Sequence, residues 1–233
     1  MTSKGSRSPD APSPLGVEGS IEPPRDCPLC PRLCEFRRRN RHDFSDFFNN
    51  PVPSFGSLDA RLLIVGLAPG LKGANRTGRP FTGDYAGDLL YGSLARHGLA
   101  RGSYQERAND GFELLGVRIS NAVRCVPPEN KPLPSEIQTC RQFLIAEIAA
   151  MPNLHAILAL GRVAHHSVVS LLALRKKDYE FAHGARNRVQ AQDGRKLEVL
   201  ASYHCSRYNT STGVLTEAMF DAVMAAAKEA AKL

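Results

Sequence analysis

Three polar side chains are the main candidates for chemistry in this chain: Asp84, Asn121 and His204. The carboxylate of Asp84 could position or activate a water molecule, or stabilise positive charge on a substrate. The amide of Asn121 can donate and accept hydrogen bonds at one ligand edge, and the imidazole of His204 can donate to an oxygen that gains negative charge. Each also has a structural interpretation: a helix cap, a buried amide that ties down a loop, and a structural histidine.

A glycine-rich turn and a long loop precede Asp84. The turn Gly66-Leu67-Ala68-Pro69-Gly70 follows the apolar run 62–65, and its glycines let the backbone come close to a ligand. Its backbone amides are therefore candidates to bind ligand carbonyls. Phe81, the single aromatic residue between Leu71 and Asp84, is a candidate stacking surface, with a loop anchor in the core as the alternative. A plain surface loop is the alternative for the whole segment.

Four cysteines have the spacing of a metal or cluster site. Two residues separate Cys27 from Cys30, and fourteen separate Cys125 from Cys140. Two thiolates with two residues between them can bind one centre, as zinc and iron–sulfur sites require. The spacing does not distinguish zinc from [4Fe–4S], and buried unliganded thiols are the remaining alternative.

Composition limits the class of protein. The chain has 233 residues and a formal net charge of +7, which suits a polyanionic partner such as nucleic acid. It has no apolar run of the roughly 18 residues that span a bilayer, and no signal peptide, so we expect a cytoplasmic protein. In such a chain six cysteines indicate metal or cluster binding more than disulfides. Cys34 and Cys205 fall outside the pattern, although Cys34 could replace Cys30.

The candidate residues need a scaffold of alternating strands and helices. Residues 1–25 read as a disordered tail, and residues 26–233 as one domain. The apolar pattern predicts strands at 62–65, 115–123, 155–160 and 197–201. It predicts helices at 32–48, 87–97, 136–150 and 162–174, a last helix with apolar residues from Leu215 to Ala227, and a loop or hairpin at 181–195. Ser135 with Gln138 predicts the cap of the third of these helices. This alternation predicts an α/β fold, a three-layer α/β/α sandwich with a central four-stranded parallel sheet.

The turn 66–70, the segment Gly78-Arg79-Pro80-Phe81-Thr82-Gly83-Asp84, and the later Asn121 and His204 resemble the motifs of the uracil-DNA glycosylase superfamily, in particular its iron–sulfur type b branch (family 5). The motifs occur in the expected order, with the cysteines between them, over about residues 25–230. The resemblance implies a [4Fe–4S] cluster. Its implied ligands are Cys27, Cys30, Cys125 and Cys140.

The resemblance also assigns roles around a flipped uracil. It implies that Phe81 stacks on the base, Asn121 reads its edge and His204 donates to its O2. Asp84 would act on the attacking water, because Ala68 stands where several other branches have a polar residue. The substrate-binding set is then Gly66, Leu67, Ala68, Gly70, Phe81, Asn121 and His204.

The loop after the histidine is implied to enter the DNA minor groove. Ser206, Arg207, Tyr208 and Asn209 form it, with Arg207 or Tyr208 as the wedge that fills the gap left by the base. A solvated loop is the alternative, and Cys205 replaces the proline that is common in the family. His183 could line the site or lie on the surface.

These observations predict a monofunctional DNA-repair glycosylase that excises uracil from DNA and leaves an abasic site. The resemblance implies a range that extends to hydroxymethyluracil, ethenocytosine and hypoxanthine. We expect a cytoplasmic, nucleoid-associated monomer with DNA as partner and no membrane association. The rival is a non-catalytic iron–sulfur or zinc nucleic-acid-binding protein. The resemblance also disfavours covalent uracil-DNA capture: in the related branch capture relies on a histidine in a longer insertion of the first loop, and residues 71–84 contain no histidine.

Overall fold

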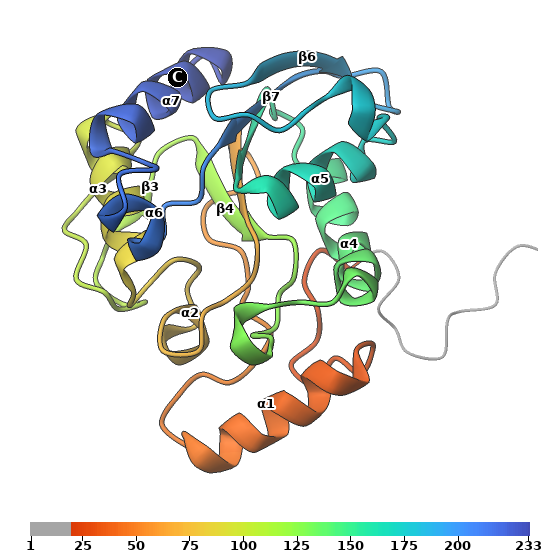
Figure 1. Ribbon diagram of the computed structural model, residues 1–233, viewed down its shortest axis with the longest axis vertical. Coiled ribbons are helices and arrows are strands. Elements are labelled where there is room, and N and C mark those ends of the chain that lie inside the picture. Colours follow the sequence, from red (N-terminus) through yellow and green to blue (C-terminus); the bar gives the residue numbers. More distant parts are fainter. Residues whose placement is uncertain (1–19) are drawn as a thin grey trace, which may run out of the picture.

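The computed structural model describes residues 20–233 and contains a five-stranded sheet between layers of helices (Figure 1). The strand order is β4 (Val117–Asn121), β1 (Leu62–Gly66), β5 (Ala156–Leu160), β7 (Lys196–Ser202) and β6 (Arg186–Gln190). The first four strands are parallel, which confirms the predicted α/β sandwich with four central strands. The fifth strand, β6, pairs antiparallel with β7 and comes from the segment expected to be a loop or hairpin.

The sheet is buried on both faces. In β1, Leu62 and Ile64 pack into one hydrophobic cluster, whereas Leu63 and Val65 pack into another on the opposite side. Alternate side chains of a strand point to opposite faces, so a continuous apolar run indicates helices on both sides. The helices α3 (Tyr85–Arg96) and α7 (Glu217–Ala230) cover the first face, and α4 (Pro134–Ala149) and α5 (Arg162–Leu171) cover the second.

Smaller elements complete the chain. The helix α1 (Pro31–Asp43) lies beyond the sheet, at the bottom of Figure 1. Two short helices lie in loops, and two short strands pair with each other. These are α2 (Ala74–Thr77), α6 (Arg207–Ser211), β2 (Ala100–Arg101) and β3 (Glu113–Leu114), with 3-10 turns at Pro128–Asn130 and Lys176–Asp178. No helix in the described range is long and apolar enough to span a membrane.

Several helix ends differ from the sequence prediction, and two of them, in α4 and α1, have a clear physical reason. The helix α4 begins at Pro134 with Leu133 as its N-cap, so the prediction of Ser135 as the cap was wrong. Proline at the first helical position has no N–H to satisfy, and the Glu136 carboxylate accepts from the Leu133 N–H at 2.7 Å. The helix α1 ends at Asp43 rather than at residue 48. The side-chain amide of Asn49 donates to the carbonyls of Asn40 and Phe44, at the end of this helix.

The N-terminal segment joins a buried charge cluster. Glu22 contacts Arg118 at 3.3 Å and Arg124 at 2.8 Å, and both arginines also pair with the fully buried Glu147 at 2.6 Å. Two cations and two carboxylates therefore balance inside the protein, as buried charges require. The sequence predicted a disordered tail over residues 1–25. Residues 1–19 of this segment lie outside the described range, and residues 20–25 include Glu22 with its two ion pairs.

Candidate active site

The three candidate catalytic side chains meet at the carboxyl edge of the sheet. Gly66, the last residue of β1, pairs in register with Asn121, the last residue of β4. His204 follows the end of β7, and Asp84 follows the loop that leaves β1. The strands β4, β1, β5 and β7 run in parallel, so their carboxyl ends share one edge, where open α/β sheets bind ligands.

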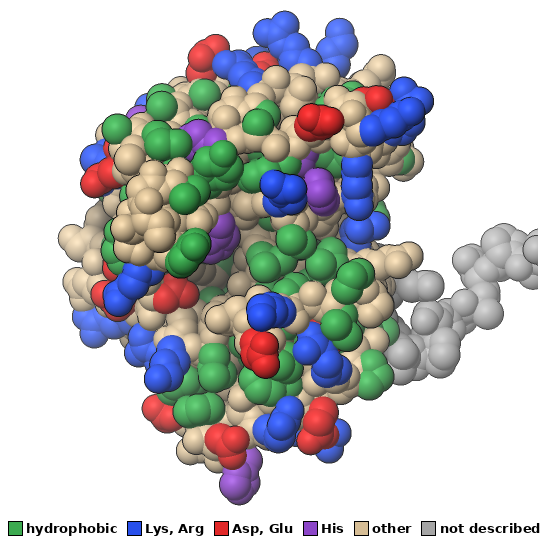
Figure 2. Space-filling view, in the orientation of Figure 1, with side chains coloured by type: hydrophobic (Ala, Val, Ile, Leu, Met, Phe, Trp, Pro, Cys, Tyr) green, Lys and Arg blue, Asp and Glu red, His purple; other side chains and the backbone are tan. Residues whose placement is uncertain are grey.

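Two adjoining cavities occupy this edge. The inner cavity, of about 40 Å³, brings together the predicted residues Phe81, Asp84, Asn121 and His204, together with Ala68, Gly70, Ala74 and Ala86. The outer cavity, of about 460 Å³, is lined by Leu67, Ala68, Gly70, Asp84, Tyr85, Ala86, Asn130, His204, Ser206 and Arg207. Figure 2 shows a hollow in the middle of the face, between α3 and α6 on the left and α4 and α5 on the right. A narrow polar end and a wider mouth therefore form one continuous site.

Gly66 makes the inner cavity possible. A Cβ atom at this position would lie 2.4 Å from Oδ1 of Asn121 and 2.5 Å from the ring of Phe81. Only glycine lets both side chains pack against the end of β1. Phe81 has a left-handed backbone, with φ of 52°, and its ring centroid lies 6.0 Å from that of His204 at an interplanar angle of 28°. The two rings form one wall of the cavity.

Asp84 is both a helix cap and a cavity residue. Its carboxylate accepts from the Gly87 N–H at 3.3 Å at the start of α3. The same carboxylate lies against the backbone of Gly73, where a Cβ atom would be 2.3 Å from Oδ2, and it also lines both cavities. The structural interpretation of this aspartate and the functional one are therefore compatible.

His204 is partly buried, and burial lowers its pKa below the ordinary value, an effect that the nearby Asp84 carboxylate opposes. The imidazole is therefore neutral at pH 7, and a neutral imidazole can still donate one N–H. The backbone carbonyl of His204 accepts from the Asn209 side-chain amide at 2.8 Å. This bond holds the strand end that carries the ring.

Two polar side chains of the inner cavity, Asn121 and His204, make no side-chain hydrogen bond within the described residues. Asn121 is only 3% exposed, yet within residues 20–233 its side-chain amide makes no hydrogen bond, and neither does the ring of His204. Buried amides are nearly always hydrogen-bonded in native proteins, so an unpaired one is typical of a ligand site. The amide of Asn121 is therefore free to bind a molecule that enters the cavity.

The loop after His204 divides into two parts. Ser206 and Arg207 line the outer cavity, and the Arg207 guanidinium lies 5.5 Å from the ring centroid of Tyr85. Tyr208 is 73% exposed and does not line the cavity, and Asn209 points back to the His204 carbonyl. The structure thus brings two of the four predicted DNA-contact residues to the mouth.

Some residues of the site were missed by sequence reasoning. Tyr85 and Ala86 begin α3 and line the outer cavity, and Asn130 reaches the mouth from the 3-10 turn after β4. Asn130 and its neighbour Glu129 both have left-handed backbones, with φ of 57° and 54°. A polar loop after a strand end was the signal available for Asn130. His183 instead lies beside β7, where its ring accepts from the Tyr203 N–H at 3.2 Å.

The four predicted cluster ligands come from three segments and border one small buried void of about 10 Å³. Cys27 and Cys30 precede α1, Cys125 follows β4, and Cys140 lies in α4. Burial raises the pKa of Cys30 and Cys125 to about 12 and that of Cys140 to about 11. Thiols of this kind ionise when a bound cation compensates the charge.

The surroundings of the cysteines suit thiolate sulfurs. The Arg37 guanidinium lies 3.5 Å from Sγ of Cys125, and the Arg124 N–H donates to Sγ of Cys140 at 3.3 Å. Cys34 lies at the same void, but its thiol donates to the Cys27 carbonyl at 3.0 Å.

In residues 20–233 no group of three or more His, Cys, Asp or Glu side chains is arranged to hold a metal ion.

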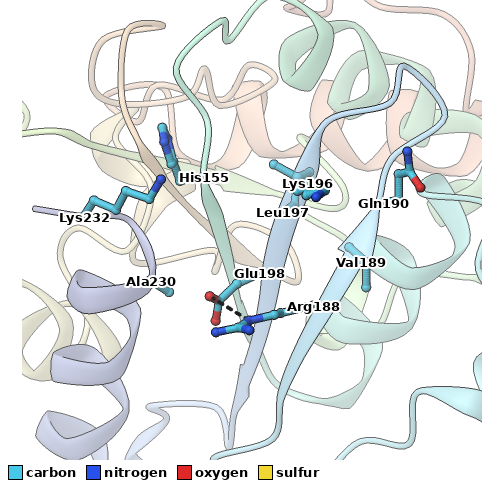
Figure 3. A pocket seen from close by; sticks show the side chains of 9 residues that line it. All are labelled: His155, Arg188, Val189, Gln190, Lys196, Leu197, Glu198, Ala230 and Lys232. Atoms are coloured by element: carbon cyan, nitrogen blue, oxygen red, sulfur yellow. Dashed lines mark ion pairs between the residues drawn. The ribbon is translucent and has the colours of Figure 1, made fainter.

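A further cavity, of about 490 Å³, lies at the opposite edge of the sheet (Figure 3). It is bounded by the amino ends of β5 and β7 and by the end of α7, and it includes Lys196, Lys232 and the ion pair of Arg188 with Glu198 at 3.5 Å. None of the candidate catalytic residues reaches it. Size alone therefore does not locate the chemistry.

Comparisons with known proteins agree with the geometry. The family model described as the uracil DNA glycosylase superfamily matches residues 53–228. A type-5 uracil-DNA glycosylase of Thermus thermophilus is 43% identical over 212 residues, covering 89% of this chain and 94% of the relative. One from Pyrobaculum aerophilum is 36% identical over 210 residues (88% and 89%), and a type-4 uracil-DNA glycosylase of Archaeoglobus fulgidus is 34% identical over 157 residues (66% and 70%). The chain belongs to the uracil-DNA glycosylase superfamily.

Proposed function

We propose that this protein is a DNA-repair glycosylase that excises uracil from DNA by hydrolysing the N-glycosidic bond. The observation that carries the proposal is the inner cavity, where Asp84, Asn121 and His204 border one space and the amide of Asn121 has no partner among residues 20–233. An extruded nucleobase needs such a space, because a glycosylase must remove the base from the helix before the sugar bond can break. Family membership supports the same activity.

The residues divide the work of binding the base. Phe81 offers an apolar face on which the base stacks. The Asn121 amide can donate to one pyrimidine atom and accept from its neighbour, and the backbone of the turn 66–70 can approach the base carbonyls. Binding in this way orients the glycosidic bond and excludes water from the base.

The bond-breaking step uses His204 and Asp84. The bond between N1 of uracil and C1′ breaks with its electron pair, and negative charge grows on the uracil. A neutral His204 that donates to O2 stabilises this charge. Water adds through its oxygen to C1′ while one of its protons passes to the Asp84 carboxylate. The side chain of Ala68 has no polar atom, so this proton transfer is assigned to Asp84.

We also propose that Cys27, Cys30, Cys125 and Cys140 hold a [4Fe–4S] cluster. The donor set is all sulfur, two N–H groups point at its sulfurs, and Cys34 uses its thiol as a donor to a carbonyl. Each thiolate of such a cluster binds a different iron, so the four sulfurs need not surround a single ion. When bound, the cluster supplies a structural link between the segment before α1, the loop after β4 and the helix α4.

DNA is the proposed partner. Arg207 lines the mouth of the outer cavity next to Ser206, at the start of α6, where backbone N–H groups and a cation can meet phosphate. We expect a monomer, localised in the cytoplasm with the nucleoid, and a substrate range that extends beyond uracil to other damaged bases. Competing base-release assays over a panel of lesions test this range.

A base-release assay tests the function. The protein is incubated in excess with a duplex that carries one uracil, and free uracil, abasic sites and strand breaks are measured. We expect free uracil and alkali-labile sites without direct strand cleavage. A protein that binds the duplex but releases no base would instead be a non-catalytic cluster-containing DNA-binding protein.

A further inference from the structure

Arg79 is a buried cation that the proposed chemistry does not use. It lies two residues before Phe81 and is only 3% exposed. Its guanidinium makes a bidentate ion pair with the Asp110 carboxylate, with N–O distances of 2.7 and 2.8 Å, and the Asp110 side chain is fully buried. Asp110 also accepts from the backbone N–H groups of Gln105 and Phe112, both at 3.0 Å. A buried arginine this fully paired has one fixed position.

An aromatic cage surrounds the guanidinium. Its carbon lies 5.1 Å from the ring centroids of Phe55 and Tyr91 and 5.6 Å from that of Tyr104. Tyr91 and Tyr104 stack on each other at 4.5 Å. Cations are attracted to the faces of aromatic rings, so the cage and the ion pair fix one another.

Arg79 and the cage also hold residues 80–83, four consecutive residues of the loop before Asp84, by hydrogen bonds. The Tyr91 hydroxyl donates to the Pro80 carbonyl at 2.6 Å, and Nε of Arg79 donates to the Thr82 hydroxyl at 2.8 Å. The Tyr104 hydroxyl accepts from the Gly83 N–H at 3.2 Å and lies 3.4 Å from the Phe81 carbonyl. These contacts lie on both sides of the left-handed Phe81, a conformation that persists only where the surroundings impose it.

We propose that Arg79, through its ion pair with Asp110 and the aromatic cage, is a positioning residue of the active site. It holds the loop 80–83 so that the Phe81 ring forms the stacking wall and Asp84 faces the cavity. This inference rests on the proposed glycosylase function for its effect on rate. The state of the loop itself can be measured without activity.

The alternative is that Arg79 contributes only to stability. The chain offers a matched control in Arg118, which is 6% exposed and pairs with Glu147 at 2.6 Å. None of the partners of Arg118 in the described chain belongs to the loop 80–84. Arg79→Lys and Arg118→Lys each keep the positive charge and remove the planar guanidinium from a buried ion pair. Tyr104→Phe is a milder variant that removes only the hydroxyl at Gly83 and Phe81.

The first arm measures single-turnover uracil release at saturating enzyme, together with the Kd for the duplex. We expect Arg79→Lys to slow release at least about tenfold, and Tyr104→Phe to slow it about threefold, with the Kd within about twofold of wild type. Arg118→Lys should lower stability and leave the rate unchanged. Equal rates for wild type, Arg79→Lys and Tyr104→Phe would overturn the proposal, as would an equal rate loss in Arg118→Lys.

The second arm is independent of activity. Hydrogen exchange at the Gly83 amide should be faster in Arg79→Lys and in Tyr104→Phe than in wild type, and unchanged in Arg118→Lys. Unchanged exchange in both cage variants would overturn the proposal even if the wild type released no base. If Arg79→Lys does not fold, Tyr104→Phe decides the matter alone, through the same rate and exchange measurements.

The third arm asks whether Arg79 acts through Phe81. In a Phe81→Ala background the ring that Arg79 positions is gone. Arg79→Lys should therefore change the logarithm of the release rate by less than about half of the change that it causes in wild type. Full additivity of the two substitutions would contradict positioning of the ring.

Discussion

At the scale of single residues, Asn121 has the most informative environment, because it is a buried amide with no partner among the described residues. If it reads a pyrimidine edge, Asn121→Ala should slow release of uracil at least about tenfold more than release of hypoxanthine, which presents a purine edge. Single-turnover rates on two otherwise identical duplexes check this. Equal losses on both substrates would contradict the reading role and leave Asn121 as a wall of the cavity.

His204 predicts a dependence of stability on pH. Its folded-state pKa lies below that of the unfolded chain, about 6.5, so the folded protein binds the proton less readily. Acidification through 6.5 then favours the unfolded chain, and stability falls until the pH drops below the folded pKa. Urea unfolding at pH 7.5 and 5.5 should show a smaller loss for His204→Gln than for wild type. An equal loss in both proteins would place the pKa of His204 at its ordinary value.

The residues of the site could be predicted only in part. Asp84, Asn121 and His204 follow from the rule that parallel strands bring their carboxyl ends to one edge, and the structure places all three at one cavity. Asn130 and Tyr85 reach the outer cavity by loop paths that no periodicity encodes. Tyr208 is exposed and does not line the outer cavity, and its predicted role in the DNA minor groove stays a prediction.

At the scale of elements, the four proposed cluster ligands predict that a cluster attaches the segment before α1 to the helix α4. Loss of one cluster ligand, as in Cys140→Ser, should abolish bound iron and loosen the segment before α1, because the proposed cluster joins that segment to α4. Cys34→Ser should keep about four irons per chain, since the Cys34 thiol is engaged with the Cys27 carbonyl.

Iron and sulfide content, with limited proteolysis around residues 27–43, measures both effects. Stoichiometric zinc in place of iron would contradict the proposed cluster, and iron loss in Cys34→Ser would make Cys34 a ligand.

The elements were predicted more accurately than their ends. The strands and helices of the central layers follow from hydrophobic periodicity, but the start of α4 depends on Pro134 and on a Glu136 carboxylate that also binds Arg32 at 2.8 Å. The contact of Glu136 with Arg32 joins residues far apart in the sequence, and local capping rules do not include such contacts. Those rules alone therefore favoured Ser135 as the cap. The strand β6 was ambiguous for a similar reason: Val189 is the one apolar residue in Arg186–Gln190, so hydrophobic periodicity is absent there, and pairing with β7 defines it as a strand.

At the scale of the whole molecule, Glu22 ties the N-terminal segment to the core. Glu22→Gln leaves Arg118 and Arg124 facing the single carboxylate of Glu147, so we expect a loss of roughly 1–3 kcal/mol in the free energy of unfolding, because Glu22 is partly exposed and the arginines are buried. Urea denaturation measures the loss.

Glu35→Gln is the matched control. Glu35 pairs with Arg38 at the surface, where both side chains are more than half exposed, and such pairs contribute about 0–1 kcal/mol. Equal stability losses in the two variants would show that the cluster around Glu147 tolerates an unbalanced charge.

The central claim, that the carboxyl edge of the sheet hydrolyses the glycosidic bond, is tested most directly at Asp84. Asn is as good an N-cap as Asp, so Asp84→Asn keeps the start of α3 while it removes the charge, and Asp88→Asn changes an exposed carboxylate in the first turn of the same helix. The measurement is the single-turnover rate of uracil release by wild type, Asp84→Asn and Asp88→Asn at saturating enzyme. The account predicts release by wild type, a loss of at least about tenfold in Asp84→Asn and an unchanged rate in Asp88→Asn. No release by wild type, or equal rates in all three proteins, would contradict it.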